Sequence, residues 1–152
     1  MLARLPLGSG ESMLLIEDEV LNELNPYRQT DPQSCEGAGV LLGYRRADHI
    51  HIVQATLPGA DDVRSRFSFW RRDRSHQHIA TREWQASGET RDYVGEWHTH
   101  PETHPTPSSV DLSEWRALCE KRQAPLILLI LGTEGNWLGV GRGIQLQELE
   151  AR

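Results

Sequence analysis

The chain has 152 residues, a length that suits one domain with one hydrophobic core. Its 16 basic and 22 acidic residues give a formal net charge of −6, which is opposite in sign to that of a general phosphate-backbone binder and excludes nucleic acid as the expected partner. Five Trp and a hydrophobic fraction of 38% exclude a mainly disordered chain, so we expect a single domain over residues 1–152.

The first half of the chain is predicted to contain short strands and two helices. Runs rich in β-branched and aromatic residues indicate strands, whereas apolar residues at helical spacing indicate helices. A hairpin is expected around residues 46–48, which separate two β-rich runs, and Ser87-Gly88 ends the second helix. The expected strands are 13–16, 39–45, 49–57 and 67–70, and the expected helices are 17–24 and 75–86.

The second half is predicted to begin with a strand over residues 93–100, which Pro101 stops. Prolines make the following loop irregular but ordered. A helix is then expected from Ser108 or Ser109 to about Arg122. The last expected strands are 125–131, 136–141 and 144–149. This order of elements predicts an α/β fold with a mixed sheet, because the regular alternation of a doubly wound fold is missing.

Cysteine content and apolar stretches predict a cytoplasmic protein that does not enter a membrane. Cys35 and Cys119 make neither a disulfide framework nor a C-x-x-C site, which favours a reducing compartment. Residues 1–10 lack the basic start and apolar core of a secretory signal. The longest apolar stretch, residues 124–131, is too short to span a bilayer and is expected to be a central strand buried on both faces.

A candidate metal site lies at the end of the strand that Pro101 stops. His98 and His100 are two residues apart, so their side chains share one strand face and can reach one ion. Asp111 follows across the proline-rich loop, in the first turn of the expected helix. Two imidazoles and one carboxylate suit Zn²⁺ and leave a fourth position for water. Asp111 also fits a helix-capping role, which can coexist with metal binding.

Other titratable patterns favour structural roles. His49 and His51 share a strand face, but no carboxylate follows them at a comparable spacing, so we expect a structural or surface role. His76 and His78 lie about 200° apart around a helix axis and cannot bind one ion together. The basic residues between positions 64 and 74 are expected to form a solvated face.

The string from Gly95 to Asp111 resembles the JAMM signature of MPN-fold metalloproteases, which reads H-x-H, seven residues, S-x-x-D. Residues 36–43, an acidic residue leading into a glycine-flanked hydrophobic run, are similar to the first motif of that family. The resemblance covers about residues 36–143. It implies an α/β, single-domain MPN fold of the cytidine-deaminase-like kind, with a mixed central sheet flanked by helices. A nucleoside deaminase itself is disfavoured, because the H-x-E and P-C-x-x-C elements are missing from the sequence.

The resemblance also assigns roles at the site. It implies that His98, His100 and Asp111 bind Zn²⁺, that Glu36 transfers protons, and that Ser108 stabilises the oxyanion. Elementary chemistry agrees with these roles, because a carboxylate can take a proton from the attacking water and deliver it to the leaving amine. A hydroxyl can donate a hydrogen bond to the oxygen on which charge develops.

Residue spacing alone does not select Glu36 as the proton-transfer group. Glu96 lies two residues before His98 on the same strand, and Glu102 lies in the loop that follows His100. Both are nearer to the metal motif in the sequence than Glu36 is. Only the resemblance ranks them lower.

More narrowly, residues 93–101 and 76–84 are similar to a bacterial JAMM subgroup encoded beside ubiquitin-activating-like and ubiquitin-conjugating-like enzymes, in CBASS-type antiphage operons and integrative elements. The implied function is an isopeptidase that hydrolyses the amide between the C-terminus of a modifier and its target. The implied modifier is a ubiquitin-like protein or a nucleotide cyclase conjugated in the same way, and the activating-like and conjugating-like enzymes are further partners.

Two alternatives belong to other functional classes. The first is a metal-free MPN scaffold that binds proteins without catalysis, which would be expected to have lost the ligands that are present here. The second is a zinc hydrolase that acts on a small molecule or trims the tail of a sulfur-carrier protein. Metal content separates the first alternative from an enzyme, and genomic neighbours separate the second from a deconjugating enzyme.

Overall fold

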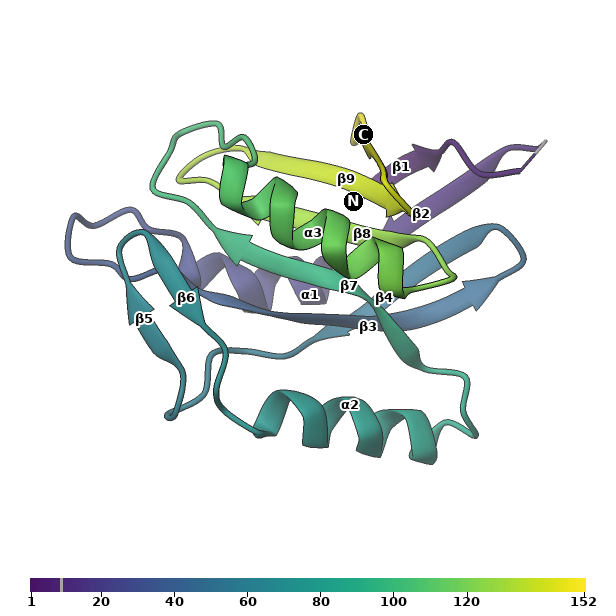
Figure 1. The fold of residues 1–152 in the computed structure, drawn as a ribbon, viewed down its shortest axis with the longest axis horizontal. Helices are drawn as coiled ribbons and strands as arrows, with labels where there is room; N and C mark the ends of the chain where they lie inside the picture. Colours follow the sequence, from purple (N-terminus) through teal and green to yellow (C-terminus); the bar gives the residue numbers. More distant parts are fainter. Residues whose placement is uncertain (9) are drawn as a thin grey trace.

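The computed structural model describes residues 1–8 and 10–152. A mixed sheet of eight strands forms its centre, and a separate two-stranded hairpin lies beside it (Figure 1). In spatial order the sheet contains β1 (Leu2–Leu5), β2 (Ser12–Ile16), β4 (His49–Ala55), β3 (Ala38–Arg46), β7 (Asp92–Thr99), β8 (Leu126–Leu131), β9 (Asn136–Arg142) and β10 (Gln145–Glu148). The hairpin contains β5 (Val63–Ser65) and β6 (Ser68–Trp70). Pairs β2–β4 and β7–β8 are parallel, so the mixed sheet expected from the sequence is confirmed.

Helices cover both faces of the sheet. They are α1 (Asp18–Leu24), the short 3₁₀ helix η1 (Asn25–Tyr27), α2 (Ser75–Ala86) and α3 (Ser109–Lys121). In Figure 1, α3 lies in front of β8 and α1 lies behind the sheet, while α2 packs against β3 and β7. Within the described residues, no helix has the length and apolarity that crossing a membrane requires.

Strand β8 is buried on both faces, as its unbroken apolar run predicts. Ile127, Leu129 and Leu131 point into the core that contains α1, whereas Leu128 and Ile130 point into a second core under α3. Full burial of such side chains stabilises the fold by roughly 1.5–3 kcal/mol each. The strand beside β7 is therefore held from both sides.

Strand β7, which carries the metal motif, is hydrogen-bonded along both edges. It runs antiparallel to β3 and parallel to β8. Gly95 is required for close contact with β8, because a Cβ at this position would lie 1.9 Å from the carbonyl oxygen of Ile127. The strand ends at Thr99, opposite Leu131 of β8, and this end presents the H-x-H residues.

The two ends of the eight-stranded sheet meet at one corner. Leu2 and Arg152 exchange two backbone hydrogen bonds, with N–O distances of 3.2 and 2.8 Å. Ala3 and Ala151 form an isolated antiparallel bridge. Strand β1 was not expected from the sequence, because its four residues are too short a run to give a clear alternation.

Candidate metal centre

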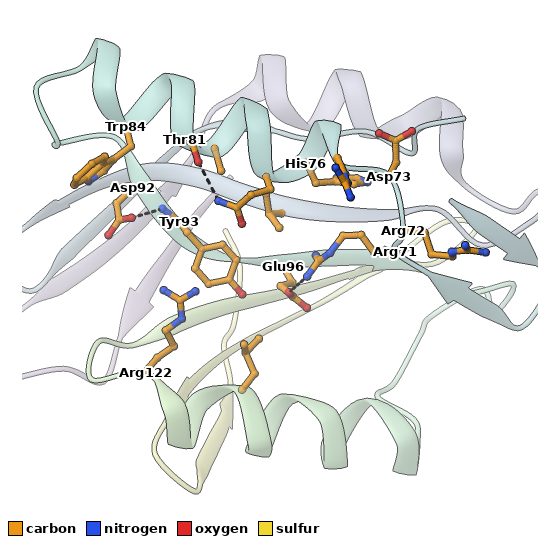
Figure 2. Close-up of a pocket in the computed structure, with 15 residues that line it drawn as sticks. Arg71, Arg72, Asp73, His76, Thr81, Trp84, Asp92, Tyr93, Glu96 and Arg122 are labelled. Atoms are coloured by element: carbon orange, nitrogen blue, oxygen red, sulfur yellow. Dashed lines mark hydrogen bonds and ion pairs between the residues drawn. The ribbon is translucent and has the colours of Figure 1, made fainter. Parts of the chain in front are cut away.

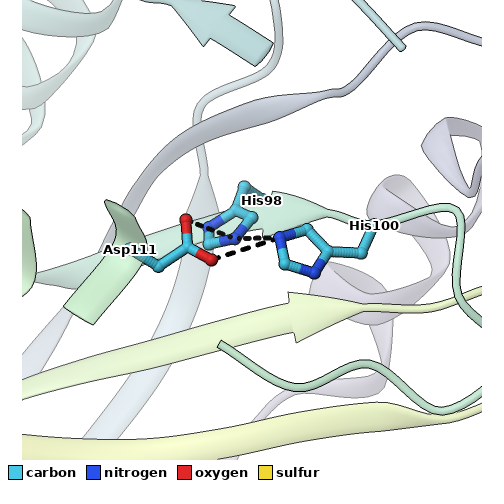
Figure 3. Close-up of side chains that lie close together, drawn as sticks. All are labelled: His98, His100 and Asp111. Carbon is cyan, nitrogen blue, oxygen red and sulfur yellow. Dashed lines mark hydrogen bonds and ion pairs between the residues drawn. The ribbon is translucent and has the colours of Figure 1, made fainter. Parts of the chain in front are cut away.

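His98, His100 and Asp111, hereafter the ligand cluster, converge on one point (Figure 3). His98 is the second-last residue of β7, His100 follows the strand, and Asp111 lies in the first turn of α3. The two Nε2 atoms are 3.1 Å apart, and the Asp111 oxygens lie 3.4 Å from His98 Nε2 and 3.2 Å from His100 Nε2. Donors on a tetrahedron with bonds of about 2.0–2.1 Å lie roughly 3.3 Å apart. The cluster therefore fits a zinc-sized ion.

Helix α3 places Asp111 through its N-terminal cap and its buried face. Ser108 Oγ accepts a hydrogen bond from Asp111 N, and Asp111 Oδ2 accepts one of 2.7 Å from Ser108 N, a capping box. Trp115, four residues after Asp111 on the same helix face, is buried with its ring 5.3 Å from the His98 ring. Trp115 also stacks on Trp137 of β9. Capping and packing together aim Asp111 at β7.

The loop over residues 101–107 is fixed by the turn between β8 and β9. Thr133 N donates to the carbonyl oxygen of Glu102 at 2.7 Å. Arg28 holds the same turn by donating to Asn136 Oδ1 at 2.7 Å. Arg28, which is distant in sequence, thus supports the segment between the histidines and the aspartate through the β8–β9 turn.

The charges within the ligand cluster favour a bound cation. Burial opposes ionisation of Asp111, but hydrogen bonds to His100 and His98 outweigh it and hold the pKa of this carboxyl far below its ordinary value. Burial lowers the pKa of His100, whereas its hydrogen bond to Asp111 raises it, and the net shift is upward. The cluster therefore stabilises positive charge beside an ionised carboxylate.

Glu36 lies in the segment that leads into β3, within electrostatic reach of the ligand cluster. Ala38 is paired with His98 in the β3–β7 register, and Thr99 N donates to the carbonyl oxygen of Gly37 at 2.9 Å. Burial raises the pKa of the Glu36 carboxyl; the nearby imidazoles lower it and the cluster's carboxylate raises it. The structure thus brings Glu36 to the site from 62 residues away in sequence.

Ser108 lies at the rim of the same site. Its hydroxyl donates to Asp111 Oδ2 at 2.7 Å, and its side chain is exposed to solvent. The hydroxyl is therefore held beside the ligand cluster by the carboxylate that caps the helix. Release of this one hydrogen bond would leave it free to donate elsewhere.

The two other acidic candidates have different partners. Glu96 forms an ion pair of 2.9 Å with Arg71, and both line a cleft of about 610 Å³ between α2 and α3 (Figure 2). Glu102 is exposed, and its Oε2 accepts a hydrogen bond from Thr106 N. Its carboxylate lies 3.9 Å from His100 Nδ1, the ring nitrogen that faces away from the cluster.

Three other histidines have structural or partly exposed partners, as the sequence led us to expect for His49 and His51. His49 Nδ1 accepts a hydrogen bond from Met13 N, and His51 pairs with Glu17 on the surface. His76 is buried, and its two ring nitrogens bond Thr56 Oγ1 at 2.6 Å and Asp62 Oδ2 at 2.8 Å. The sequence analysis did not identify Thr56 and Asp62 as partners of His76.

The expectation of a solvated basic face is wrong for Arg64. Its guanidinium donates to the carbonyl oxygens of Glu36, at 2.7 Å, and Cys35, at 3.2 Å. It also lies over the Tyr27 ring at 5.8 Å. These partners are backbone groups and an aromatic ring, which a charge pattern in the sequence cannot reveal.

Comparisons with known proteins define the class. The family described as prokaryotic homologs of the JAB domain matches residues 24–142, and the chain belongs to this family. A solution structure of a Desulfitobacterium hafniense protein has a similar fold, with a TM-score of 0.64 and 22% identity over 90% of this chain and 89% of that one. The expected JAMM/MPN family and α/β fold are confirmed.

Relatives with descriptive names narrow the class. An Escherichia coli protein named "CD-NTase/cGAS isopeptidase" is 40% identical over 129 residues, which are 85% of this chain and 82% of that protein. A Sinorhizobium fredii protein named "Probable metalloprotease" is 28% identical over 68% of this chain and 66% of its own length. The first name agrees with the narrower bacterial subgroup that the sequence resembles.

Proposed function

We propose that this chain is a zinc-dependent isopeptidase. It hydrolyses the amide bond that joins the C-terminal carboxyl of a nucleotide cyclase, or of a ubiquitin-like modifier, to an amine on a target protein. The convergence of His98, His100 and Asp111 at spacings suited to a tetrahedral metal carries the proposal. The isopeptidase name of a relative 40% identical supports the substrate class.

The residues divide the chemistry between them. His98, His100 and Asp111 hold the ion, which when bound supplies a Lewis acid that polarises a carbonyl and acidifies water. Glu36 takes a proton from the attacking water and passes it to the departing amine, so the C–N bond breaks to give a carboxylic acid and an amine. Ser108 donates its hydroxyl hydrogen to the carbonyl oxygen as negative charge develops there.

The proposed biological setting is supported by the name of the same relative and by the two free cysteines. Cys35 and Cys119 are not joined by a disulfide, which suits a reducing bacterial cytoplasm. The proposed partners are the conjugated cyclase or modifier, its target, and the activating-like and conjugating-like enzymes that make the conjugate. The proposed role is to reverse conjugation in antiphage defence, and the proposed domain covers residues 1–152.

The test uses two substrates, each with a single amide bond to be cleaved. In the first substrate, the C-terminal carboxyl of a nucleotide cyclase (a CD-NTase) is joined to a lysine side chain of a reporter protein. In the second substrate, the same carboxyl is joined to the α-amine of the reporter. Intact-mass spectrometry should find the cyclase released with its own last residue intact. Metal removal should stop cleavage, and one equivalent of Zn²⁺ should restore it.

Three results would contradict the proposal. Cleavage that persists in metal-free protein would exclude the metal role. Absence of cleavage of both substrates by zinc-loaded protein would exclude the isopeptidase, and turnover of a sulfur-carrier tail under those conditions would favour the alternative hydrolase. Protein that purifies without zinc, takes up none when Zn²⁺ is supplied, and binds the cyclase without cleaving it would favour a scaffold.

A further inference from the structure

The residue between the two histidine ligands has a separate set of contacts. Because side chains alternate along a strand, Thr99 points to the face of β7 opposite His98 and His100. Its exposure is 0%, and Gln29, which it contacts, is 2% exposed. Neither residue belongs to the ligand cluster, and the proposed chemistry uses neither.

The hydroxyl of Thr99 both accepts and donates a hydrogen bond, and so connects two segments of the chain. It accepts a hydrogen bond of 2.9 Å from Gly37 N and donates one of 2.9 Å to Gln29 Oε1. The backbone of Thr99 adds a third bond, because its N–H donates to the carbonyl oxygen of Gly37 at 2.9 Å. The residue that follows Glu36 is therefore fastened to the centre of the H-x-H motif by one backbone and one side-chain hydrogen bond.

Gln29 extends the connection to the β5–β6 hairpin. Its Nε2 donates to the carbonyl oxygens of Ser34, at 3.2 Å, and Arg66, at 2.7 Å. Glu36 itself is held by the same hairpin, since its N–H donates to the carbonyl oxygen of Ser65 at 2.7 Å. A buried side-chain network of this kind, with every group satisfied, restricts a segment to one position.

We propose that Thr99 and Gln29 are positioning residues, which set the place of the Glu36 carboxyl relative to the ligand cluster through Gly37. This inference rests on the proposed function, in which Glu36 moves the proton. Glu36 lies in a loop without regular secondary structure, so these contacts replace the sheet pairing that would otherwise fix it. A misplacement of about 1 Å at a reacting group can cost about 100-fold in rate.

The direct test is Thr99→Val, which keeps the shape of the side chain and removes the hydroxyl. We expect kcat to fall about 10- to 100-fold, with KM and zinc content close to those of the wild type. Thr99→Ser keeps the hydroxyl and should recover most of kcat. The Gly37 amide, which loses its acceptor, should exchange with solvent faster in Thr99→Val than in Thr99→Ser, with or without metal.

Two comparisons separate positioning from general loosening of the fold. Thr56→Val is the matched control, because Thr56 is a buried threonine whose hydroxyl also joins a backbone N–H, that of Val40, to a side chain. It should lower Tm without lowering kcat. In a Glu36→Gln background, Thr99→Val should change kcat by less than about twofold, since the group that it positions is already lost.

The inference is overturned if Thr99→Val cleaves at the wild-type rate, if Thr56→Val loses as much kcat, or if the loss persists in full beside Glu36→Gln. It is also overturned if Thr99→Val loses its zinc, which would place the effect on the ligands. If the wild type cleaves no conjugate at all, the proposed function fails. Unchanged hydrogen exchange of the Gly37 amide in Thr99→Val would by itself refute the positioning role of Thr99.

Discussion

Among the described residues, the sheet carries two H-x-H pairs, and only the pair at the end of β7 has a carboxylate close to both of its rings. His49 and His51 on β4 and His98 and His100 near the end of β7 have the same spacing. Within the part of the chain that the structure describes, the pair on β4 has one carboxylate partner, Glu17, which contacts His51 between two partly exposed side chains. In the pair on β7, both Nε2 atoms face each other and a shared carboxylate.

This difference shows that H-x-H spacing on a strand brings two imidazoles together, whereas the neighbouring element determines whether a carboxylate reaches both of them. A capped helix with a buried Trp115 covers the β7 pair and brings Asp111 to both rings. Beside the β4 pair, the ring of Tyr44 lies with its centroid 6.2 Å from that of His51, and Glu17 reaches a single imidazole. Matched substitutions in the two regions test this distinction.

The largest effect is expected when one imidazole of each pair is replaced. His100→Gln should lose bound zinc and reduce turnover by about 1000-fold or more, because the ion contributes several kcal/mol of charge stabilisation. His51→Gln should keep both metal and turnover. Elemental analysis measures bound zinc, and cleavage rates measure turnover. A His100→Gln protein that still binds metal and is active would show that the β4 and β7 pairs do not differ in metal binding.

The carboxylate beside each pair gives the next largest effect. Glu36→Gln should keep zinc and fold while slowing cleavage by about 100-fold or more, the lower range for a general acid–base group. Glu17→Gln and Glu96→Gln should keep most activity. If Glu96→Gln is inactive with zinc bound and Glu36→Gln is normal, the proton-transfer role belongs on the metal-binding strand.

A smaller effect is expected from the aromatic neighbours. Trp115→Leu removes the ring that packs against His98, and loss of such outer support typically costs about 10- to 100-fold in metal affinity. Tyr44→Leu is the control beside His51 and should leave metal affinity unchanged. Competition with a chelator of known zinc affinity gives the values; equal affinities in the two variants would mean that the covering helix is not what separates the pairs.

The smallest effect concerns the Glu17–His51 pair itself. Both side chains are partly exposed, so a double-mutant cycle on the free energy of unfolding should give a coupling of only about 0.2–1 kcal/mol. Urea unfolding of the wild type, the two single variants and the double variant measures it. A coupling of several kcal/mol would show that the β4 pair is a specific structural site and not a surface contact.

Local patterns predicted much of this fold. The bounds of α2 agree with the sequence-based expectation, and the run of apolar residues in β8 identified a strand buried on both faces. Residue spacing and the expected start of the helix also predicted that Asp111 lies close to the two histidines. These features depend on residues close together in the sequence, where the periods of strands and helices are fixed.

The rest depends on which strands become neighbours. Glu36 reaches the site only because β3 lies beside β7, with Ala38 opposite His98, and no local pattern encodes that pairing. Only the family resemblance had selected Glu36, through the role that it implies for this residue. Gln29 gave no signal, because a glutamine whose partners are Thr99 and backbone carbonyls looks like any polar residue in a loop.

The backbone hydrogen bonds between Leu2 and Arg152 protect one corner of the sheet from pairing with other chains. Unpaired strand edges can recruit other chains, and terminal residues usually fray. Here the outermost residues of the first strand and those following the last strand satisfy one another's backbone groups. A donor fluorophore at one end and an acceptor at the other would therefore lie close together, and loss of energy transfer would report the opening of this corner before the remaining strands separate.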